Sequence, residues 1–230
     1  MSEVQKAIQS MMQAVAVPTN QGRSVANPRV VCISRDCGAG GDDIAHLLAK
    51  RLGVEVYDHV ILDKIAQRLN ADPAALKSLD SGVSQFRDMW LYSLVTGQHL
   101  TADSYKRHLV NVLLSLGRSG GVIIGRGGHL VLAHSGALRV RFTGSEDLCA
   151  QRLARAENID VETARRKVEE TNQKRGKFIW DTFHERLNDP KTFDLVINTD
   201  HITNNAKVVD MLVEAMNMVA LPDVKAHPAL

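Results

Sequence analysis

A glycine-rich turn, Gly38-Ala39-Gly40-Gly41, follows an apolar stretch and precedes a helix-like pattern. In a strand, turn and helix of this kind, unpaired backbone N–H groups and the positive end of the helix dipole meet at one point, which favours a bound phosphate. Glycine also tolerates the positive φ angles of an anion-binding turn and lets the backbone approach a ligand closely. The same turn can simply join a strand to a helix, but its place after the first strand favours a phosphate site. We expect that site to be made by Gly38, Ala39, Gly40, Gly41, Asp42 and Asp43.

One alternative is a dinucleotide-binding turn of the form GxGxxG, in which Gly38 and Gly40 would be the first two glycines. Asp58, after the second apolar stretch, would then bind a ribose hydroxyl. However, Asp43 occupies the position of the third glycine, and no tyrosine precedes a lysine by four residues near any expected strand. The sequence therefore favours a dinucleotide site less than a phosphoryl-transfer site.

In a phosphoryl-transfer site the turn would be a modified GxxxxGK[ST] loop, with Gly41 in the place of the lysine and Asp43 near the place of the hydroxyl. Phosphoryl transfer depends on positioning and on neutralising the charge of the transferred group, so another cation must replace the lysine. Arg35, at the entrance of the loop, is the nearest candidate, although it could equally face solvent. Asp43 or Asp36 could hold Mg²⁺, directly or through water, because that ion prefers carboxylate and water oxygens. At a helix start such an aspartate could equally be a cap.

The elements that must position this turn follow an alternating pattern of strands and helices. The first apolar stretch is almost continuously apolar, which is typical of a strand covered by helices on both faces. The pattern predicts an α/β fold with a parallel, doubly wound sheet. The expected strands are Arg29–Ser34, Val54–Tyr57, Gly121–Ile124, Leu138–Phe142 and Asp194–Asn198.

Helical periodicity without a strand fills residues 62–118, which predicts a helical insert, and a long basic helix is expected over residues 161–183. Residues 3–17 have apolar side chains at three-and-four spacing, which predicts an amphipathic helix that docks on the domain or on a second subunit. A homodimer through this helix is therefore plausible. We divide the chain into a helix and linker at 1–28, a main domain at 29–220 and a tail at 221–230.

Composition excludes several classes of protein. The chain has 230 residues and a formal net charge of +2, which gives no general attraction to nucleic acid or to a membrane surface. Aromatic residues make up 4% of the chain and are not interleaved with basic residues, so base stacking on single-stranded nucleic acid is not expected. Three cysteines without CxxC spacing, and no apolar run long enough for a membrane span, favour a cytoplasmic protein.

Five segments in matching order, between residues 29 and 217, carry a family resemblance: the glycine loop, VEVYDHVILDKIA, VIIGRGGHLVLA, LRVRFTGSEDLCAQRLARAENID and NDPKTFDLVINTD. In this combination the chain resembles the cytidylate kinase-like family, relatives of P-loop nucleoside monophosphate kinases whose glycine loop lacks the usual lysine. The resemblance implies a three-layer P-loop NTPase-type α/β fold with a five-stranded parallel sheet, a helical insert and a helical lid. It also implies ATP as donor, Mg²⁺ as cofactor and a nucleoside monophosphate such as CMP as acceptor.

The resemblance further implies roles for individual residues. Arg126, at the end of the third strand, would bind the acceptor phosphate, since an arginine at a strand end suits bidentate phosphate binding. Asp58 and Lys64 would line the acceptor site, although Asp58 could instead cap a helix. In the lid, residues 145–185, arginines would close over the phosphates; these are Arg152, Arg155, Arg166 and Arg175. The catalytic cations we expect are Arg35, Arg126, Arg152 and Arg175.

The sequence leaves three candidate functions open. The leading expectation is a kinase that transfers the γ-phosphate of ATP to CMP, dCMP or a similar small phosphorylated acceptor. A nucleotide-binding regulator without turnover is the rival, because Gly41, Ile124 and Gly127 all stand where parent kinases have charged groups. An NAD(P)-dependent dehydrogenase is the third possibility, and it would be indifferent to ATP.

Overall fold

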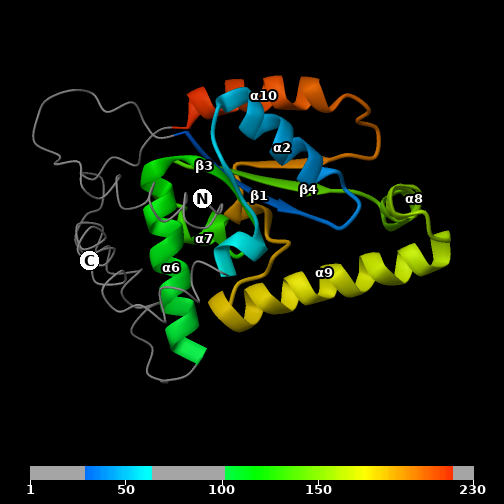
Figure 1. Ribbon diagram of the computed structural model, residues 1–230, viewed down its shortest axis with the longest axis horizontal. Coiled ribbons are helices and arrows are strands. Elements are labelled where there is room, and N and C mark those ends of the chain that lie inside the picture. The colour runs from blue at the N-terminus through cyan, green and yellow to red at the C-terminus, as the bar shows by residue number, and fades with distance from the viewer. Residues whose placement is uncertain (1–28, 64–101, 220–230) are drawn as a thin grey trace, which may run out of the picture.

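The computed structural model describes residues 29–63 and 102–219 and shows a five-stranded parallel sheet (Figure 1). The strand order is β2-β3-β1-β4-β5, so β1 lies at the centre. The strands are β1 (Val30–Arg35), β2 (Val56–Tyr57), β3 (Gly121–Ile124), β4 (Leu138–Thr143) and β5 (Leu195–Asn198). All five expected strands are confirmed, each within two residues of its predicted ends.

Helices cover both faces of the sheet and give three layers. On one face, α2 (Gly41–Leu52) and α10 (Asn205–Met218) pack over Val31 and Ile33 of β1. On the other face, α6 (Ala102–Ser119), α7 (Gly128–Val131) and the end of α9 (Val161–Phe183) pack over Val30 and Cys32. Consecutive residues of β1 thus point into two different cores, which explains why this strand is apolar throughout. The three-layer fold predicted from the sequence is confirmed.

The helix boundaries follow from local chemistry. The carboxylate of Asp160 accepts a hydrogen bond from the backbone N–H of Thr163 and so caps the start of α9. Residues in the left-handed conformation end three helices: Gly53 after α2, Asn158 after α8 (Glu146–Glu157) and His184 after α9. The long basic helix expected at 161–183 is therefore present with the same bounds. A short 3₁₀ helix, η2 (Pro190–Thr192), leads into β5.

Several expectations fall outside the described residues. The amphipathic helix at 3–17, the linker, the tail and most of the insert belong to this group, and so does the homodimer that would depend on the first of them. Within residues 102–118 the insert is helical, as predicted, because α6 covers that range. In the described ranges, 29–63 and 102–219, no helix is long and apolar enough to cross a membrane.

The fold places a crevice at the carboxyl ends of β1 and β3. The chain leaves β1 toward α2 on one face of the sheet and leaves β3 toward α7 on the opposite face. Neighbouring strands whose connections diverge in this way leave a crevice between their loops, where open α/β sheets bind ligands.

Candidate functional site

The glycine loop joins β1 to α2 and has the backbone geometry of an anion-binding turn. Gly38 and Gly40 have φ angles of +78° and +76°, which disfavour any residue with a Cβ atom. Gly40 is the N-cap of α2, and no side chain of the described residues caps that helix. The N–H groups at the start of α2 therefore have no acceptor within the helix, and they can bind an anion.

Contacts on three sides hold the loop in place. The Cys37 N–H donates to Oδ1 of Asn172 on α9, at 2.8 Å. Asp36 accepts hydrogen bonds from Arg141 at 2.7 Å and from the Thr143 hydroxyl at 2.6 Å, so β4 fixes the residue that precedes the loop. Gly38 packs so closely on α8 that a Cβ atom there would lie 2.3 Å from the carbonyl oxygen of Cys149. The loop is thus rigidly positioned before any ligand binds.

Two residues of the predicted phosphate site are already engaged. The loop has no lysine, because Gly41 stands in its place. The buried guanidinium of Arg35, the expected substitute, pairs with the carboxylate of Asp42 at 2.8 Å. The N–H of Ala39 donates to the carbonyl oxygen of Asp36 at 3.3 Å, so it turns back into the loop. Asp42 can therefore offer an anion only its backbone N–H, and its carboxylate offsets part of the positive charge of Arg35.

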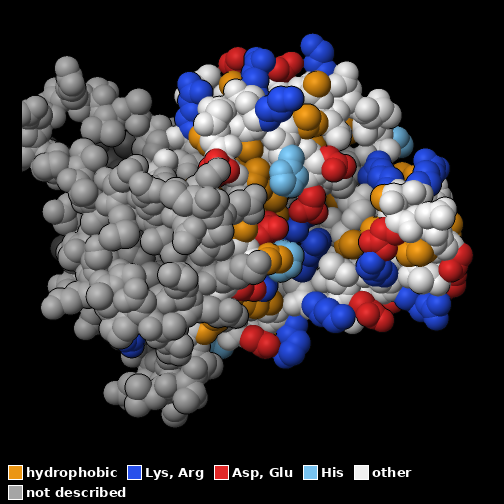
Figure 2. All heavy atoms as spheres, viewed as in Figure 1, with side chains coloured by type: hydrophobic (Ala, Val, Ile, Leu, Met, Phe, Trp, Pro, Cys, Tyr) orange, Lys and Arg blue, Asp and Glu red, His pale blue; other side chains and the backbone are white. Residues whose placement is uncertain are grey.

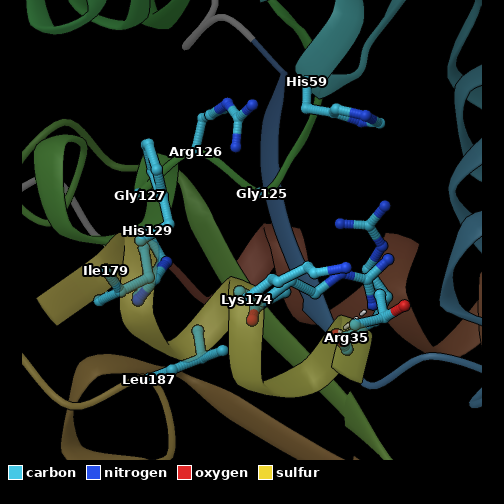
Figure 3. A pocket seen from close by; sticks show the side chains of 13 residues that line it. Arg35, His59, Gly125, Arg126, Gly127, His129, Lys174, Ile179 and Leu187 are labelled. Atoms are coloured by element: carbon cyan, nitrogen blue, oxygen red, sulfur yellow. Dashed lines mark hydrogen bonds between the residues drawn. The ribbon is translucent and has the colours of Figure 1, made fainter. Parts of the chain in front are cut away.

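A cavity of about 380 Å³ lies beside the loop, at the carboxyl ends of β1 and β3. Of the described residues that line it, none is Asp or Glu, whereas four are Lys or Arg. Figure 3 shows the cavity from close by, and Figure 2 shows basic, histidine and acidic side chains together in the hollow above α9. The lining residues are Ser34, Arg35, His59, Gly125, Arg126, Gly127, His129, Thr171, Lys174, Arg175, Phe178, Ile179 and Leu187.

Arg175 is the cation in this cavity whose charge is least compensated. Its guanidinium donates to the carbonyl oxygen of Arg35 at 3.0 Å and forms no ion pair with the described residues. Burial, and next the positive charge of Arg35, lower the pKa of Arg175 below its ordinary value. A partly buried cation beside a second cation favours the arrival of an anion, which would form charge-assisted hydrogen bonds to it.

Arg126 is held by a separate set of contacts. Its guanidinium forms two hydrogen bonds to Asp63, and the Tyr105 hydroxyl donates to the same carboxylate at 2.6 Å. Burial opposes ionisation of Asp63, but Arg126 and Tyr105 outweigh it and hold the pKa of that carboxyl below its ordinary value. The guanidinium also lies 4.5 Å from the ring centre of Phe178 on α9. These contacts fix the orientation of Arg126 at the edge of the cavity.

The backbone around Arg126 is strained. Gly125, Arg126 and Gly127 all have positive φ angles, and for Arg126, at +52°, this costs on the order of 1 kcal/mol. A Cβ atom on Gly127 would lie 2.2 Å from the Phe183 ring, so the turn also needs glycine for space. Strain that the surrounding structure maintains is typical of functional sites.

His129 closes the cavity on the side of α7. The side chain is 3% exposed and stacks on the Phe193 ring, with centroids 4.4 Å apart. Burial, and next the charges of Arg141 and Arg139, lower the pKa of His129 to about 3, so the ring is neutral near pH 7. Its Nε2 atom has no hydrogen-bond partner among the described residues. An unpaired buried polar atom costs about 1–3 kcal/mol, so a ligand that pairs with it gains affinity.

The structure does not bring every predicted site residue to the cavity. Arg152 donates to the hydroxyl of Thr199 at 3.0 Å and to its carbonyl oxygen at 2.6 Å, beyond the end of β5. Arg155 is exposed on α8, and exposed Arg166 donates to the Thr163 hydroxyl. The cavity thus contains Arg35, Arg126 and Arg175, whereas the roles given to Arg152, Arg155 and Arg166 stay predictions.

Two acceptor-side predictions have different outcomes. Asp58 accepts a hydrogen bond from the backbone N–H of Ile61 at 2.9 Å, so it caps the short helix that begins at residue 59. This is the structural alternative considered for Asp58, and Asp58 is not among the residues that line the cavity. Lys64 lies outside the described residues.

The residues present suit a magnesium ion only in part. Residues 29–63 and 102–219 contain no group of three or more His, Cys, Asp or Glu side chains that could hold a metal ion. Asp36 and Asp42 are paired with arginines, and Asp43 is exposed on the first turn of α2. Mg²⁺ often keeps several waters and binds through one carboxylate together with substrate phosphates. Asp43 has no arginine partner among the described residues but does not line the cavity, so its role as a magnesium ligand stays a prediction.

Sequence reasoning missed several residues that line the cavity, notably Lys174, Phe178 and His129, and also Asp63 and Tyr105, which hold Arg126 from outside it. The spacing of Thr171, Lys174, Arg175 and Phe178 places them on one face of a helix, which was a usable signal. No local pattern, by contrast, indicates that Asp63 and Tyr105 meet Arg126.

The strand order, with a glycine loop after the central strand and helices on both faces, defines a P-loop kinase-type domain. The sequence model described as Cytidylate kinase-like family matches residues 30–201. The chain belongs to that family, as the sequence resemblance indicated.

One solved structure shows the same fold at low sequence identity, and two others are similar to this chain at lower TM-scores. An uncharacterized protein from Eubacterium ventriosum is similar with a TM-score of 0.62 and 16% identity, over 82% of this chain and 98% of that one. A shikimate kinase from Bacteroides thetaiotaomicron has a TM-score of 0.44 and 14% identity, over 82% and 98% of the two chains. A gluconokinase from Sinorhizobium meliloti has a TM-score of 0.46 and 16% identity, over 84% and 94%. No curated protein matched.

Proposed function

We propose that this protein is a phosphotransferase that moves the γ-phosphate of ATP to a small phosphorylated acceptor such as CMP or dCMP. The observation that carries the proposal is the position of Arg175 in a cavity beside the start of α2. Among the described residues this partly buried cation has no carboxylate partner, and no side chain caps that helix. Membership of the cytidylate kinase-like family supports a phosphotransferase and suggests the acceptor.

In the reaction, an oxygen of the acceptor phosphate forms a bond to the γ-phosphorus while the bond to ADP breaks. No protein nucleophile is needed, so the protein contributes positioning and charge neutralisation. The backbone N–H groups of residues 40–43 would hold the donor phosphates. Arg35 and Arg175 would supply the positive charge that a loop lysine provides elsewhere. Arg126, fixed by Asp63, would hold the acceptor phosphate at the other side of the cavity.

The proposal is tested by measuring ADP formation with CMP, dCMP, UMP and AMP as acceptors, using the full chain and Mg²⁺. For the best acceptor, Arg175→Met should lower kcat/KM by about 100-fold, because it removes a charge-assisted contact to the transferred group. Lys177→Met is the matched control, since Lys177 is an exposed cation on the same helix, paired with Asp181. We expect kcat/KM of the control to stay within about twofold of the wild type.

A nucleotide-binding regulator without turnover is the second candidate. The cavity lining favours it in one respect, because the described lining residues include no carboxylate that could bind a metal or orient an acceptor. Isothermal titration distinguishes the two functions. Binding of ATP and CMP without any ADP formation would support the regulator, whereas turnover that depends on Arg175 would support the kinase.

A further inference from the structure

The cavity beside the glycine loop has two chemically different ends. Figure 3 shows Arg35 and Lys174 on one side, while His129, Ile179 and Leu187 lie together on the other, where Arg126 also lies. The first side attracts an anionic group, and the second offers one cation, two apolar side chains and one uncharged ring. A ligand that fills both ends must therefore join a phosphate or similar anion to an uncharged body.

His129 is the polar group at the uncharged end, and the fold keeps its ring in place. Phe193 stacks on it at 4.4 Å with an angle of 18° between the rings. The neighbouring Gly128 packs on Ile123 of β3, where a Cβ atom would lie 3.0 Å from the isoleucine side chain. The start of α7 thus packs directly against the sheet.

The hydrogen-bonding state of His129 points to a ligand. The ring is 3% exposed, and its Nε2 has no partner among the described residues although the ring lines the cavity. Buried polar atoms in folded proteins nearly always have a partner, so an exception of this kind needs a cause. Nε2 of a neutral ring donates or accepts one hydrogen bond according to its tautomer. The apolar side chains of Ile179 and Leu187 beside the ring favour an uncharged partner over a phosphate.

We infer that His129 determines acceptor specificity by forming a hydrogen bond to an uncharged amine, carbonyl or hydroxyl group of an acceptor whose phosphate is held by Arg126. This inference rests on the proposed function, because it takes the cavity as the acceptor site. The acceptor class that follows is a phosphate monoester joined to a ring with polar edge groups, as in a nucleotide base. A bare sugar phosphate satisfies the cationic end and leaves Nε2 without a partner.

The experiment compares two probes, CMP and ribose 5-phosphate, by isothermal titration with the full chain. His129→Phe keeps an aromatic ring against Phe193 but removes both ring nitrogens, so it should weaken CMP binding by about tenfold. The same variant should leave the affinity for ribose 5-phosphate within about twofold of the wild type. His129→Gln keeps an uncharged hydrogen-bonding group and should retain most of the CMP affinity. His46→Gln, at an exposed position of α2, is the control for loss of a histidine.

A measurement on the wild type covers the case in which a variant does not fold. The ¹⁵N signal of Nε2 in His129 should shift when CMP is added and stay in place with ribose 5-phosphate. The inference is wrong if CMP leaves that signal unchanged, or if His129→Phe weakens both probes equally. If neither probe binds the wild type, the proposed function fails as well; if both bind and the CMP preference survives in His129→Phe, this inference alone fails.

Discussion

Burial changes what Arg175 and His129 can do as individual residues. Arg175 remains a cation, but with its pKa lowered by burial and by Arg35, it gains from any anion that reaches it. His129 is kept neutral and lies beside the apolar side chains of Ile179 and Leu187, which favour an uncharged partner. The two side chains line the same cavity and select opposite kinds of group. A ligand that satisfies both has to carry its charge at one end.

The depressed pKa of His129 makes a prediction about stability. Its pKa is about 3 in the folded protein against an ordinary value of 6.5, so below pH 6.5 the unfolded chain binds a proton that the folded protein does not. The folded state is favoured above pH 6.5 and loses stability as the pH falls toward 3. Between pH 6.5 and 5, the free energy of unfolding of the wild type should fall by about 2 kcal/mol more than that of His129→Gln. Urea denaturation at both pH values measures this difference, and equal losses in the two proteins would contradict the assignment.

At the level of elements, the glycine loop depends on α8 and α9 as much as on β1 and α2. Asn172 of α9 binds the Cys37 N–H, and the backbone of Cys149 on α8 lies directly against Gly38. The two helices of the predicted lid therefore hold the loop in shape. A change in α9 can alter nucleotide binding without touching a nucleotide.

Alanine substitutions at two glycines of the loop distinguish the stability cost of a steric clash from the cost of the left-handed backbone conformation. Gly38 and Gly40 have nearly equal φ angles, but a Cβ atom would collide with Cys149 at Gly38 and meet nothing within 4 Å at Gly40. Gly40→Ala should therefore cost about 1 kcal/mol of stability, the price of the left-handed conformation. Gly38→Ala should cost about 3 kcal/mol or more, because overpacking is added. Thermal denaturation measures both, and equal losses would show that α8 does not press on the loop.

The elements were predictable from sequence where the signal is local. A near-continuous apolar stretch predicted β1, shorter apolar patterns predicted the other four strands, and Asp160 stands directly before the start predicted for α9. The position of each arginine around the axis of α9 could also have shown which lid arginines face the cavity. Arg175 shares a face with the buried Ile179, whereas Arg166 lies nine residues earlier, about half a turn away at 100° per residue. Which cations face the cavity was thus partly encoded in the spacing of apolar residues.

Contacts between distant segments were not predictable in this way. Arg126 meets Asp63 across 63 residues and Phe178 across 52, and no pattern within any one segment indicates either contact. The cap formed by Asp58 shows the opposite case, where a local role explains a residue that had also been considered for ligand binding. Long-range pairing depends on the whole fold, and a single sequence contains no direct record of it.

For the whole molecule, charge placement matters more than total charge. The formal net charge is +2, which attracts no particular anion. The parallel sheet, however, brings the ends of β1 and β3 together, and α9 crosses beside them with Lys174 and Arg175. Cations from separate parts of the chain thereby collect next to the uncapped start of α2, and the described lining residues add no acid. The fold itself thus concentrates positive charge around this cavity.

The most direct test of this account is a crystal structure of the full chain with a non-hydrolysable ATP analogue, Mg²⁺ and CMP. We predict that the analogue's phosphates contact the backbone N–H groups of residues 40–43, and that the terminal phosphate lies within hydrogen-bond distance of Arg175. A structure with both ligands bound elsewhere, and with the glycine loop empty, would contradict the central claim.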